Sequence, residues 1–389
     1  MNFSLTEEQL AVKEAAREFA QKELKPGVIE RDSKMEFPKE QVRAMGELGF
    51  LGIMVDPKYG GSGMDTMSYV LAMEEISKVD NSCSVTMSVN NSLVCWGIET
   101  FGTEEQKQKY LPKLATGEWI GSFCLSEPEA GSDATMQRTT AVDMGDHYLL
   151  NGTKNWITSG GSSSVHLVIA QTNPEKKHRG INAFIVETSW DGVVVGAKED
   201  KLGIRSSDTH TIMYTDVKVP KENRIGEDGF GFKFAMKTLS GGRIGIASQA
   251  LGIAGGAYEL ALAYSKEREA FGKPISQHQA IAFKLAQMAT DIEAAKMMVY
   301  RAAWLKDNGM DYSQASAMAK LYASEVAMKH TVEAVQIHGG YGFVKEYHVE
   351  RLMRDAKITQ IYEGTSEVQQ IVISRGVLKG DVYLPVGEN

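Results

Sequence analysis

The apolar residues between positions 118 and 225 fall into short runs of strand length, and longer helical stretches stand on both sides. The clearest runs cover 166–170, 181–186 and 193–195, separated by Gly, Asn, Asp and Ser. Successive runs leave no room for the helices of about 10 to 15 residues that connect parallel strands. We therefore predict an antiparallel barrel or sandwich rather than a doubly wound parallel sheet.

The stretch before these strands carries helix-start signals. Thr6 with Gln9, and Thr103 with Gln106, are spaced as capping boxes, and Pro26 ends the first helix. We predict an N-terminal helical domain over 1–117 and a middle antiparallel β domain over 118–226.

Behind the strands, helical patterns run from 232 to about 266, from 277 to 307 and from 312 to 337, with a shorter one at the C-terminus. They predict a C-terminal four-helix bundle over 227–389, and so a mostly α, α+β fold. The first pattern is nearly free of charge between Arg243 and Glu259. That segment is expected to be buried on most sides, with a neighbouring subunit as one source of cover.

Length and composition limit the classes of function. A chain of 389 residues is longer than the size at which a single hydrophobic core keeps growing, so two or three domains are expected. A composition of 43% hydrophobic and 24% charged residues is ordinary for a soluble enzyme. The net charge of −8 disfavours nucleic acid as a partner, although a local basic pocket for a phosphorylated ligand stays open. Three cysteines without CxxC spacing fit a reducing compartment, and no apolar run reaches about 18 residues. We expect a cytoplasmic protein without a membrane partner.

Familiar catalytic motifs are missing from the sequence. It contains no GxGxxG between a strand and a helix, no P-loop, no HExxH, no GxSxG elbow and no metal-spaced His/Cys cluster. No metal is expected. With these motifs absent, an organic redox cofactor is the remaining source of catalytic reactivity, and a single general base would act together with it.

Glu363 is the candidate base. It stands between Tyr362 and Gly364, just ahead of a helix start, where a carboxylate partly stripped of water would have a raised pKa. The alternative is a loop glutamate in water, which composition alone favours.

Two stretches in the β zone could hold a cofactor. Residues 123–133 end a strand in a turn whose backbone N–H groups, with the Ser126 and Ser132 hydroxyls, could face a polar heterocycle or a phosphate. Residues 155–161 place Trp156 beside the hydroxyl of Thr158. An ordinary turn and a core tryptophan are the alternatives.

Taken together, the motifs resemble those of acyl-CoA dehydrogenases. LSEPxAGSD (125–133), NWITSGG (155–161), REAFGK (268–273), QIHGGYG (336–342) and IYEGTSE (361–367) occur in that family's order and spacing, and the likeness runs from Leu5 to about Gly376. Residues 87–92 and 242–247 are most similar to the short-chain, or butyryl-CoA, branch.

The resemblance implies FAD between the last two domains and a homotetramer or dimer. The residues that would line the flavin are Leu125, Ser126, Ser132, Trp156 and Thr158, with Thr365 and Glu367 touching the cofactor after the base. The residues that would hold the adenine dinucleotide arm of a neighbouring subunit's flavin are Arg268, Phe271, His278, Gln279, Gln336, Gly339 and Gly340. Taken singly, Arg268 could be half of a surface ion pair, Phe271 a bundle core residue and Gly339–Gly340 a helix C-cap.

The implied reaction converts an acyl-CoA to a trans-2-enoyl-CoA. Glu363 would remove the α-proton while the flavin takes the β-hydride, and electron-transfer flavoprotein would accept the electrons. Some family members carry the base just before the arginine matching Arg243, but Gly242 stands there. The resemblance places Ser132, Arg243, Tyr362 and Gly364 around the substrate, with Arg243 supporting the loop of the base or, alternatively, satisfied by a buried carboxylate for structural reasons.

Two positions depart from the family pattern. Ser240 replaces a common aspartate, which puts a contact to CoA in doubt, and Glu129 replaces a common glycine, so we expect its carboxylate to point to solvent. An acyl-CoA oxidase and a non-catalytic binding or scaffold protein on the same fold remain the competing functions.

Overall fold

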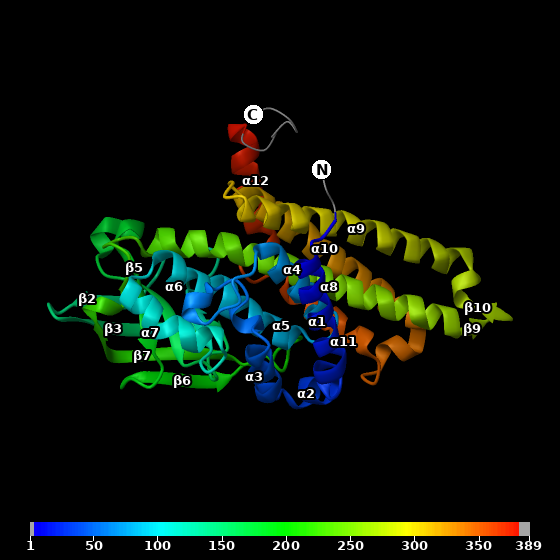
Figure 1. Cartoon of the computed structure of the whole chain (residues 1–389), viewed down its shortest axis with the longest axis horizontal. Coiled ribbons are helices and arrows are strands. Elements are labelled where there is room, and N and C mark those ends of the chain that lie inside the picture. Colours follow the sequence, from blue (N-terminus) through cyan, green and yellow to red (C-terminus); the bar gives the residue numbers. More distant parts are fainter. Residues whose placement is uncertain (1–3, 381–389) are drawn as a thin grey trace.

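A computed structural model describes residues 4–380. Residues 1–3 and 381–389, which begin the predicted first domain and end the third, lie outside the described part. Figure 1 places a β-sheet at one end of the molecule and long helices that run from it to the opposite end. Within residues 4–380, no helix is both long and apolar enough to cross a bilayer.

The N-terminal helices surround one flank of the long helices. Both predicted capping boxes are confirmed: Thr6 accepts from the Gln9 N–H, and Thr103 from that of Gln106. The first helix ends just before Pro26, as predicted. The elements are α1 (Glu7–Phe19) continuing as a π-helical turn η1 (Ala20–Leu24), α2 (Val28–Lys34), α3 (Lys39–Glu47), η2 (Phe50–Gly52), η3 (Pro57–Tyr59), α4 (Thr66–Ser77), α5 (Asn81–Ser88) continuing as a π-helix η4 (Val89–Cys95), α6 (Trp96–Phe101) and α7 (Glu104–Ala115).

The three strands predicted from apolar runs are confirmed as β4, β5 and β6. The strands are β1 (Gly121–Cys124), β2 (Thr140–Asp143), β3 (His147–Thr158), β4 (Val165–Gln171), β5 (Ile181–Glu187), β6 (Val193–Lys198), β7 (Thr209–Pro220) and β8 (Arg224–Ile225). They form one sheet in the order β6-β7-β3-β2-β4-β5-β8, with β1 also paired to β4.

The sheet is not wholly antiparallel, which corrects the prediction. β1 and β2 both pair parallel to β4, while the other pairings are antiparallel. Parallel neighbours need a long connection. Here β3 and the loop that follows it connect β2 to β4, so the connection needs no crossover helix. The sequence between β2 and β4 accordingly shows no helical pattern.

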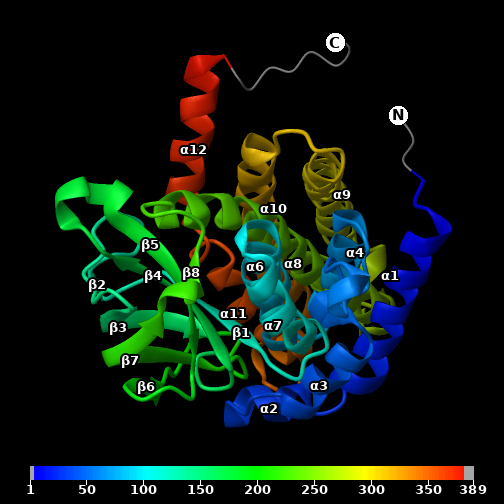
Figure 2. The ribbon, with the colours of Figure 1, turned by 60° about the vertical axis from the view of Figure 1, so that its left-hand side comes forward.

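The three long C-terminal helices match their predicted bounds within two residues. They are α8 (Gly231–Glu267), α9 (Gln279–Asp307) and α10 (Ser313–His338); β9 (Glu269–Ala270) and β10 (Lys273–Pro274) form a small hairpin between α8 and α9. Two shorter helices follow, α11 (His348–Ile358) and α12 (Ser366–Lys379). α11 packs on α8 and α10, whereas α12, predicted as the fourth bundle helix, packs on α10 and projects from the body (Figure 2).

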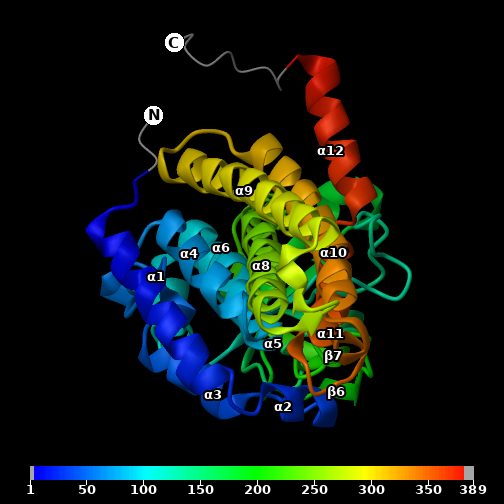
Figure 3. The same ribbon diagram turned by 90° about the vertical axis from the view of Figure 1, so that its right-hand side faces the viewer.

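The charge-poor part of α8 is buried, as predicted, but its own chain supplies the cover. Residues 241–254 are all buried among α4, α5, α9, α10 and α11 (Figure 3). A neighbouring subunit is therefore not needed to explain the missing charges.

Asp355 of α11 fixes the three parts of the chain to one another. Its buried carboxylate accepts hydrogen bonds from the Ile204 backbone N–H (2.6 Å), the Asn81 side chain (3.0 Å) and Arg351 (3.1 Å). These donors come from the loop before β7, from α5 and from α11 itself. The loop that leaves α11 toward Glu363 thus starts from a rigid base.

Candidate active site

The loop between α11 and α12 holds Glu363 in an unusual backbone conformation. Glu363 has φ +53° and Gly364 has φ +94°, so two consecutive residues are left-handed. Only glycine adopts such angles without strain, and a non-glycine residue there costs about 1–3 kcal/mol. A Cβ added at Gly364 would also lie 2.6 Å from Nε2 of Gln369, so the Gln369 amide would have to shift.

The Glu363 carboxylate points into the protein and meets helix α8 at Gly242. A Cβ added to Gly242 would lie 2.1 Å from Oε2 of Glu363, so the absence of a side chain at 242 is what admits the carboxylate. Oε2 is buried and, within residues 4–380, has no hydrogen-bond partner. The water-exposed alternative is therefore wrong for this glutamate.

Burial raises the pKa of Glu363 from 4.5 to about 7, and the positive charges of Lys320 and Arg243 limit that rise. A carboxyl group with this pKa is about half ionised at neutral pH and holds a proton far more tightly than an exposed glutamate. It is therefore ionised enough to accept a proton, and it binds that proton strongly, as a general base must.

Arg243 lies close to Glu363 in the structure, and Tyr362 and Gly364 are its neighbours in the loop. Burial lowers the pKa of Arg243, while the charge of Glu363 raises it, and the Arg243 Nε has no acceptor among the described residues. The Tyr362 hydroxyl donates to Oε1 of Gln249 on α8. Within residues 4–380, the backbone N–H of Glu363 also has no acceptor.

The two predicted cofactor stretches of the β zone lie side by side. The Asn155 N–H donates to the Ser126 carbonyl (2.8 Å), and the Ser122 hydroxyl donates to the Thr158 carbonyl (2.8 Å). Leu125 and Ser126 follow the end of β1, and Trp156 and Thr158 end β3. The two motifs therefore lie next to each other in the fold.

Trp156 does not behave as a core tryptophan. Its side chain is 61% exposed and its φ is +62°, a strained value for a bulky residue. Ser132 lies exposed in the turn after Gly131. Glu129 is exposed and paired with Arg138, so its carboxylate points to solvent as expected.

A buried ion pair under these loops was missed from the sequence. Lys154 is fully buried; its ammonium donates to Glu127 (2.7 Å), to the Leu125 carbonyl (3.0 Å) and to Gln137. Glu127 also accepts from the backbone N–H groups of 138 and 139. Lys154 thus fixes the loop that carries Leu125. The sequence signal that could have indicated this ion pair is a lysine inside a strand, one residue before the NWITSGG motif.

The second predicted set lies at the opposite end of the molecule. Arg268 and Phe271 belong to the β9–β10 hairpin region, which Figure 1 places at the end of α8 far from the sheet. A helix of 37 residues is about 55 Å long, so one chain does not bring the two sets together. The rest of this distal set is His278 and Gln279 at the start of α9, with Gln336, Gly339 and Gly340 at the end of α10.

Two of the structural alternatives for this distal set are wrong. Phe271 is 96% exposed, so it is not a bundle core residue. The Arg268 guanidinium lies over the Tyr341 ring, 5.6 Å from its centre, and is not in an ion pair within residues 4–380. Gly339 does cap α10, with φ +61°. Near the base, Thr365 is the N-cap of α12, and Glu367 is exposed in its first turn.

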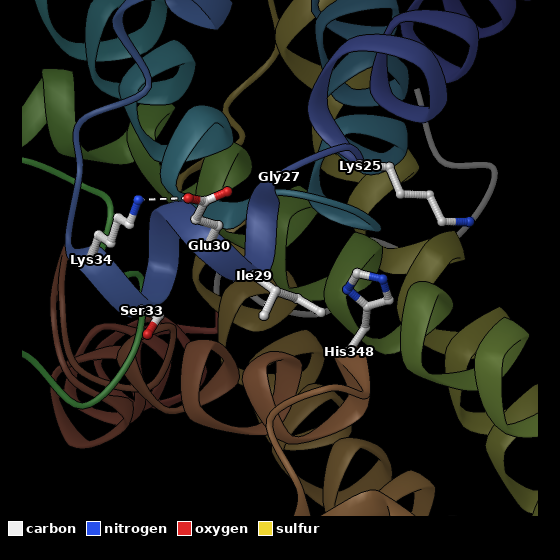
Figure 4. Close-up of a pocket in the computed structure, with 7 residues that line it drawn as sticks. All are labelled: Lys25, Gly27, Ile29, Glu30, Ser33, Lys34 and His348. Atoms are coloured by element: carbon white, nitrogen blue, oxygen red, sulfur yellow. Dashed lines mark hydrogen bonds and ion pairs between the residues drawn. The ribbon is translucent and has the colours of Figure 1, made fainter.

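A separate hollow of about 530 Å³ lies between α2 and the start of α11 (Figure 4). It is lined by Lys25, Gly27, Ile29, Glu30, Ser33, Lys34 and His348. His348 begins α11, whereas Glu363 follows its other end, about 16 Å along the helix axis. The hollow contains none of the predicted site residues.

The chain belongs to the acyl-CoA dehydrogenase family. Its residues 6–118, 122–217 and 229–378 match the N-terminal, middle and C-terminal domains of acyl-CoA dehydrogenases. It is accordingly an oxidoreductase of this class.

The similar proteins include short-chain enzymes. A short-chain specific acyl-CoA dehydrogenase of Clostridium acetobutylicum is 51% identical, over 97% of this chain and all of that one. The caffeyl-CoA reductase-Etf complex subunit CarC of Acetobacterium woodii is 49% identical, over 96% of this chain and 99% of that one.

Solved structures show the same fold. Butyryl-CoA dehydrogenase from Megasphaera elsdenii superposes with a TM-score of 0.96 at 49% identity, over 97% of this chain and all of that one. A glutaryl-CoA dehydrogenase from Mycobacterium smegmatis, in complex with FADH2, superposes with a TM-score of 0.92 at 32% identity, over 98% and 96% of the two chains.

Proposed function

We propose that this enzyme dehydrogenates short-chain acyl-CoA thioesters to trans-2-enoyl-CoA with FAD, and that Glu363 removes the α-proton. The observation that carries the proposal is the Glu363 carboxyl group opposite Gly242, whose buried Oε2 has no hydrogen-bond partner among residues 4–380 and whose pKa is about 7. The short-chain and butyryl-CoA enzymes among the similar proteins support the substrate class.

An α-proton next to a thioester is weakly acidic, so negative charge that develops on the thioester oxygen must be stabilised. The backbone N–H of Glu363, which has no acceptor among the described residues, would donate to that oxygen next to the carboxylate that takes the proton. Tyr362 and Gly364 flank the thioester, and Arg243 supports the loop through its charge. Ser132 would contact the substrate from the β domain.

The β-domain surface fits FAD. Trp156 is exposed beside Thr158, and the buried Ser159 hydroxyl has no partner among the described residues. Leu125, Ser126, Ser132, Trp156 and Thr158 would hold the flavin ring, with Thr365 and Glu367 close to the base. When bound, FAD supplies a two-electron acceptor for the hydrogen on the β-carbon.

We further propose that each cofactor site uses two chains, in a homotetramer. The set around Arg268 and Phe271 lies at the end of α8, a helix about 55 Å long, away from the sheet that carries Trp156, and the Phe271 ring is almost fully exposed (Figure 1). Arg268, Phe271, His278, Gln279, Gln336, Gly339 and Gly340 would hold the adenine dinucleotide arm of a partner's FAD. The three proposed domains are 1–117, 118–226 and 227–389.

Electron-transfer flavoprotein is the proposed electron acceptor, supported by the Etf complex that contains the A. woodii relative. An oxidase would instead produce peroxide rapidly in air without that partner. Purified protein that stays colourless with added FAD would indicate a scaffold.

The decisive experiment compares the wild type with Glu363→Gln, using butyryl-CoA under anaerobic conditions. We expect yellow protein in both cases, bleaching of the wild type by substrate, and loss of most turnover in the variant. Comparable turnover in the two proteins would refute Glu363 as the base. A scan of acyl-CoAs of increasing length then defines the chain-length preference.

A further inference from the structure

Lys320 is a buried cation behind the loop of the base. It lies on α10 with no exposed surface, and the one side-chain hydrogen bond that it makes within the described residues goes from Nζ to the Gly364 carbonyl, at 2.5 Å. Burial lowers its pKa to about 8, and the nearby charge of Glu363 opposes that change. No carboxylate of residues 4–380 forms an ion pair with it. A buried ammonium without an ion-pair partner is costly, which calls for a compensating role.

We propose that Lys320 is a positioning residue for Glu363, which holds the left-handed Glu363–Gly364 turn through the Gly364 carbonyl and keeps the carboxylate ionised through its charge. This inference rests on the proposed role of Glu363 as the base. It adds a residue that touches neither the carboxylate nor, on the proposed arrangement, the substrate.

The backbone geometry explains the need for a tether. The φ of Glu363, +53°, is strained, and the surrounding structure must maintain it. Two donors from two helices converge on the Gly364 carbonyl: Lys320 from α10, and Nε2 of Gln369 from α12 at 2.8 Å. Nε2 of Gln369 also lies 3.3 Å from the Glu363 carbonyl. Gln369 is therefore a neutral tether, and only Lys320 adds charge.

The charged and titratable groups around Glu363 come from four directions. Arg243 faces it from α8, Lys320 from α10, Tyr69 from α4, and Tyr362 precedes it in the loop. Lys320 is the larger of the two charge effects that lower the Glu363 pKa. Removal of one such cation raises the pKa of a buried carboxyl group by about one unit or more.

The test compares Lys320→Met with two matched variants of the holoenzyme. Gln369→Leu removes the neutral tether and leaves the charge. Lys306→Met removes another lysine whose pKa burial lowers to about 8, but this lysine contacts Met54 Sδ at 3.9 Å and exerts no charge effect on Glu363. The readouts are kcat and KM for butyryl-CoA across pH, with the thermal midpoint measured in parallel.

We expect Lys320→Met to move the acid limb of the kcat profile upward by about one pH unit and to lower the plateau of kcat about tenfold or more, with KM changed less. Gln369→Leu should lower kcat without moving the limb, and Lys306→Met should leave the limb in place. If Lys320→Met does not fold, Lys320→Gln, which keeps a donor without the charge, should still move the limb.

An unmoved limb in the Lys320 variants, or an equal movement in Lys306→Met, would overturn the inference. Failure of the underlying function is distinguished by Glu363→Gln: if that variant turns over normally, Glu363 is not the base. If it is inactive while the Lys320 variants match the wild type, only the role of Lys320 is wrong.

Discussion

Replacement of Glu363 by Gln should stabilise the enzyme, and the gain should grow with pH. The buried carboxyl group has a pKa of about 7 in the folded chain against 4.5 when exposed. The folded state therefore binds more protons than the unfolded state between these values, and its stability falls as pH rises. Glutamine has the shape of the protonated acid and carries no such penalty.

The magnitude follows from the two pKa values. The full difference corresponds to about 3 kcal/mol above pH 7, and at about pH 5.5 to only about 1 kcal/mol. With an unfolding entropy of about 2 cal/mol/K per residue, the thermal midpoint of the variant should exceed that of the wild type by about 4 °C at about pH 8.5 and by only about 1 °C at about pH 5.5.

Differential scanning calorimetry of both holoenzymes at the two pH values measures this difference. Glu23→Gln, which changes an exposed carboxylate, is the control and should show no pH-dependent gain. A constant offset between Glu363→Gln and the wild type, or a gain that shrinks as pH rises, would show that the Glu363 carboxyl group is not perturbed by burial.

Three further substitutions address other parts of the site. Gly242→Ala should lower kcat about a hundredfold in steady-state assays while FAD is retained, because its Cβ would displace the Glu363 carboxylate; unchanged kcat would contradict that geometry. Lys154→Met should cost about 3–5 kcal/mol in unfolding experiments and weaken FAD retention, since it leaves the Glu127 charge buried and unpaired; retention equal to the wild type would argue against its support of the cofactor loop. Phe271→Ala should change the free energy of unfolding by less than about 0.5 kcal/mol yet release FAD on gel filtration, and full retention would speak against a two-chain site.

Helix lengths were predictable because they depend on local signals. Capping boxes marked the starts of α1 and α7, and apolar periodicity gave the bounds of α8, α9 and α10 within two residues. α12 was predicted as a bundle member although only Gln369 and Gly376 of its residues are buried. Its composition resembles that of a packed helix, and local pattern does not reveal whether a surface exists to receive it.

Short motifs were enough to predict several residues of the site, but the buried charges that act on those residues could not be predicted. Short motifs led to Glu363 and Trp156, but Lys154 and Lys320 matter through burial at positions that only the tertiary fold defines. The parallel pairing of β1 and β2 with β4 was missed for the same reason, since register between distant strands leaves no local trace.

The great length of α8 has a genetic consequence. On the proposed assembly, a substitution at Trp156 and a substitution at Phe271 impair the same kind of cofactor site, but each acts from a different chain of the pair. When a Trp156 variant and a Phe271 variant are co-expressed, a pair with one chain of each has two cofactor sites. One site contains both substitutions, and the other contains neither. Two inactive alleles would then complement each other, whereas two faults on the same side of the pocket would not.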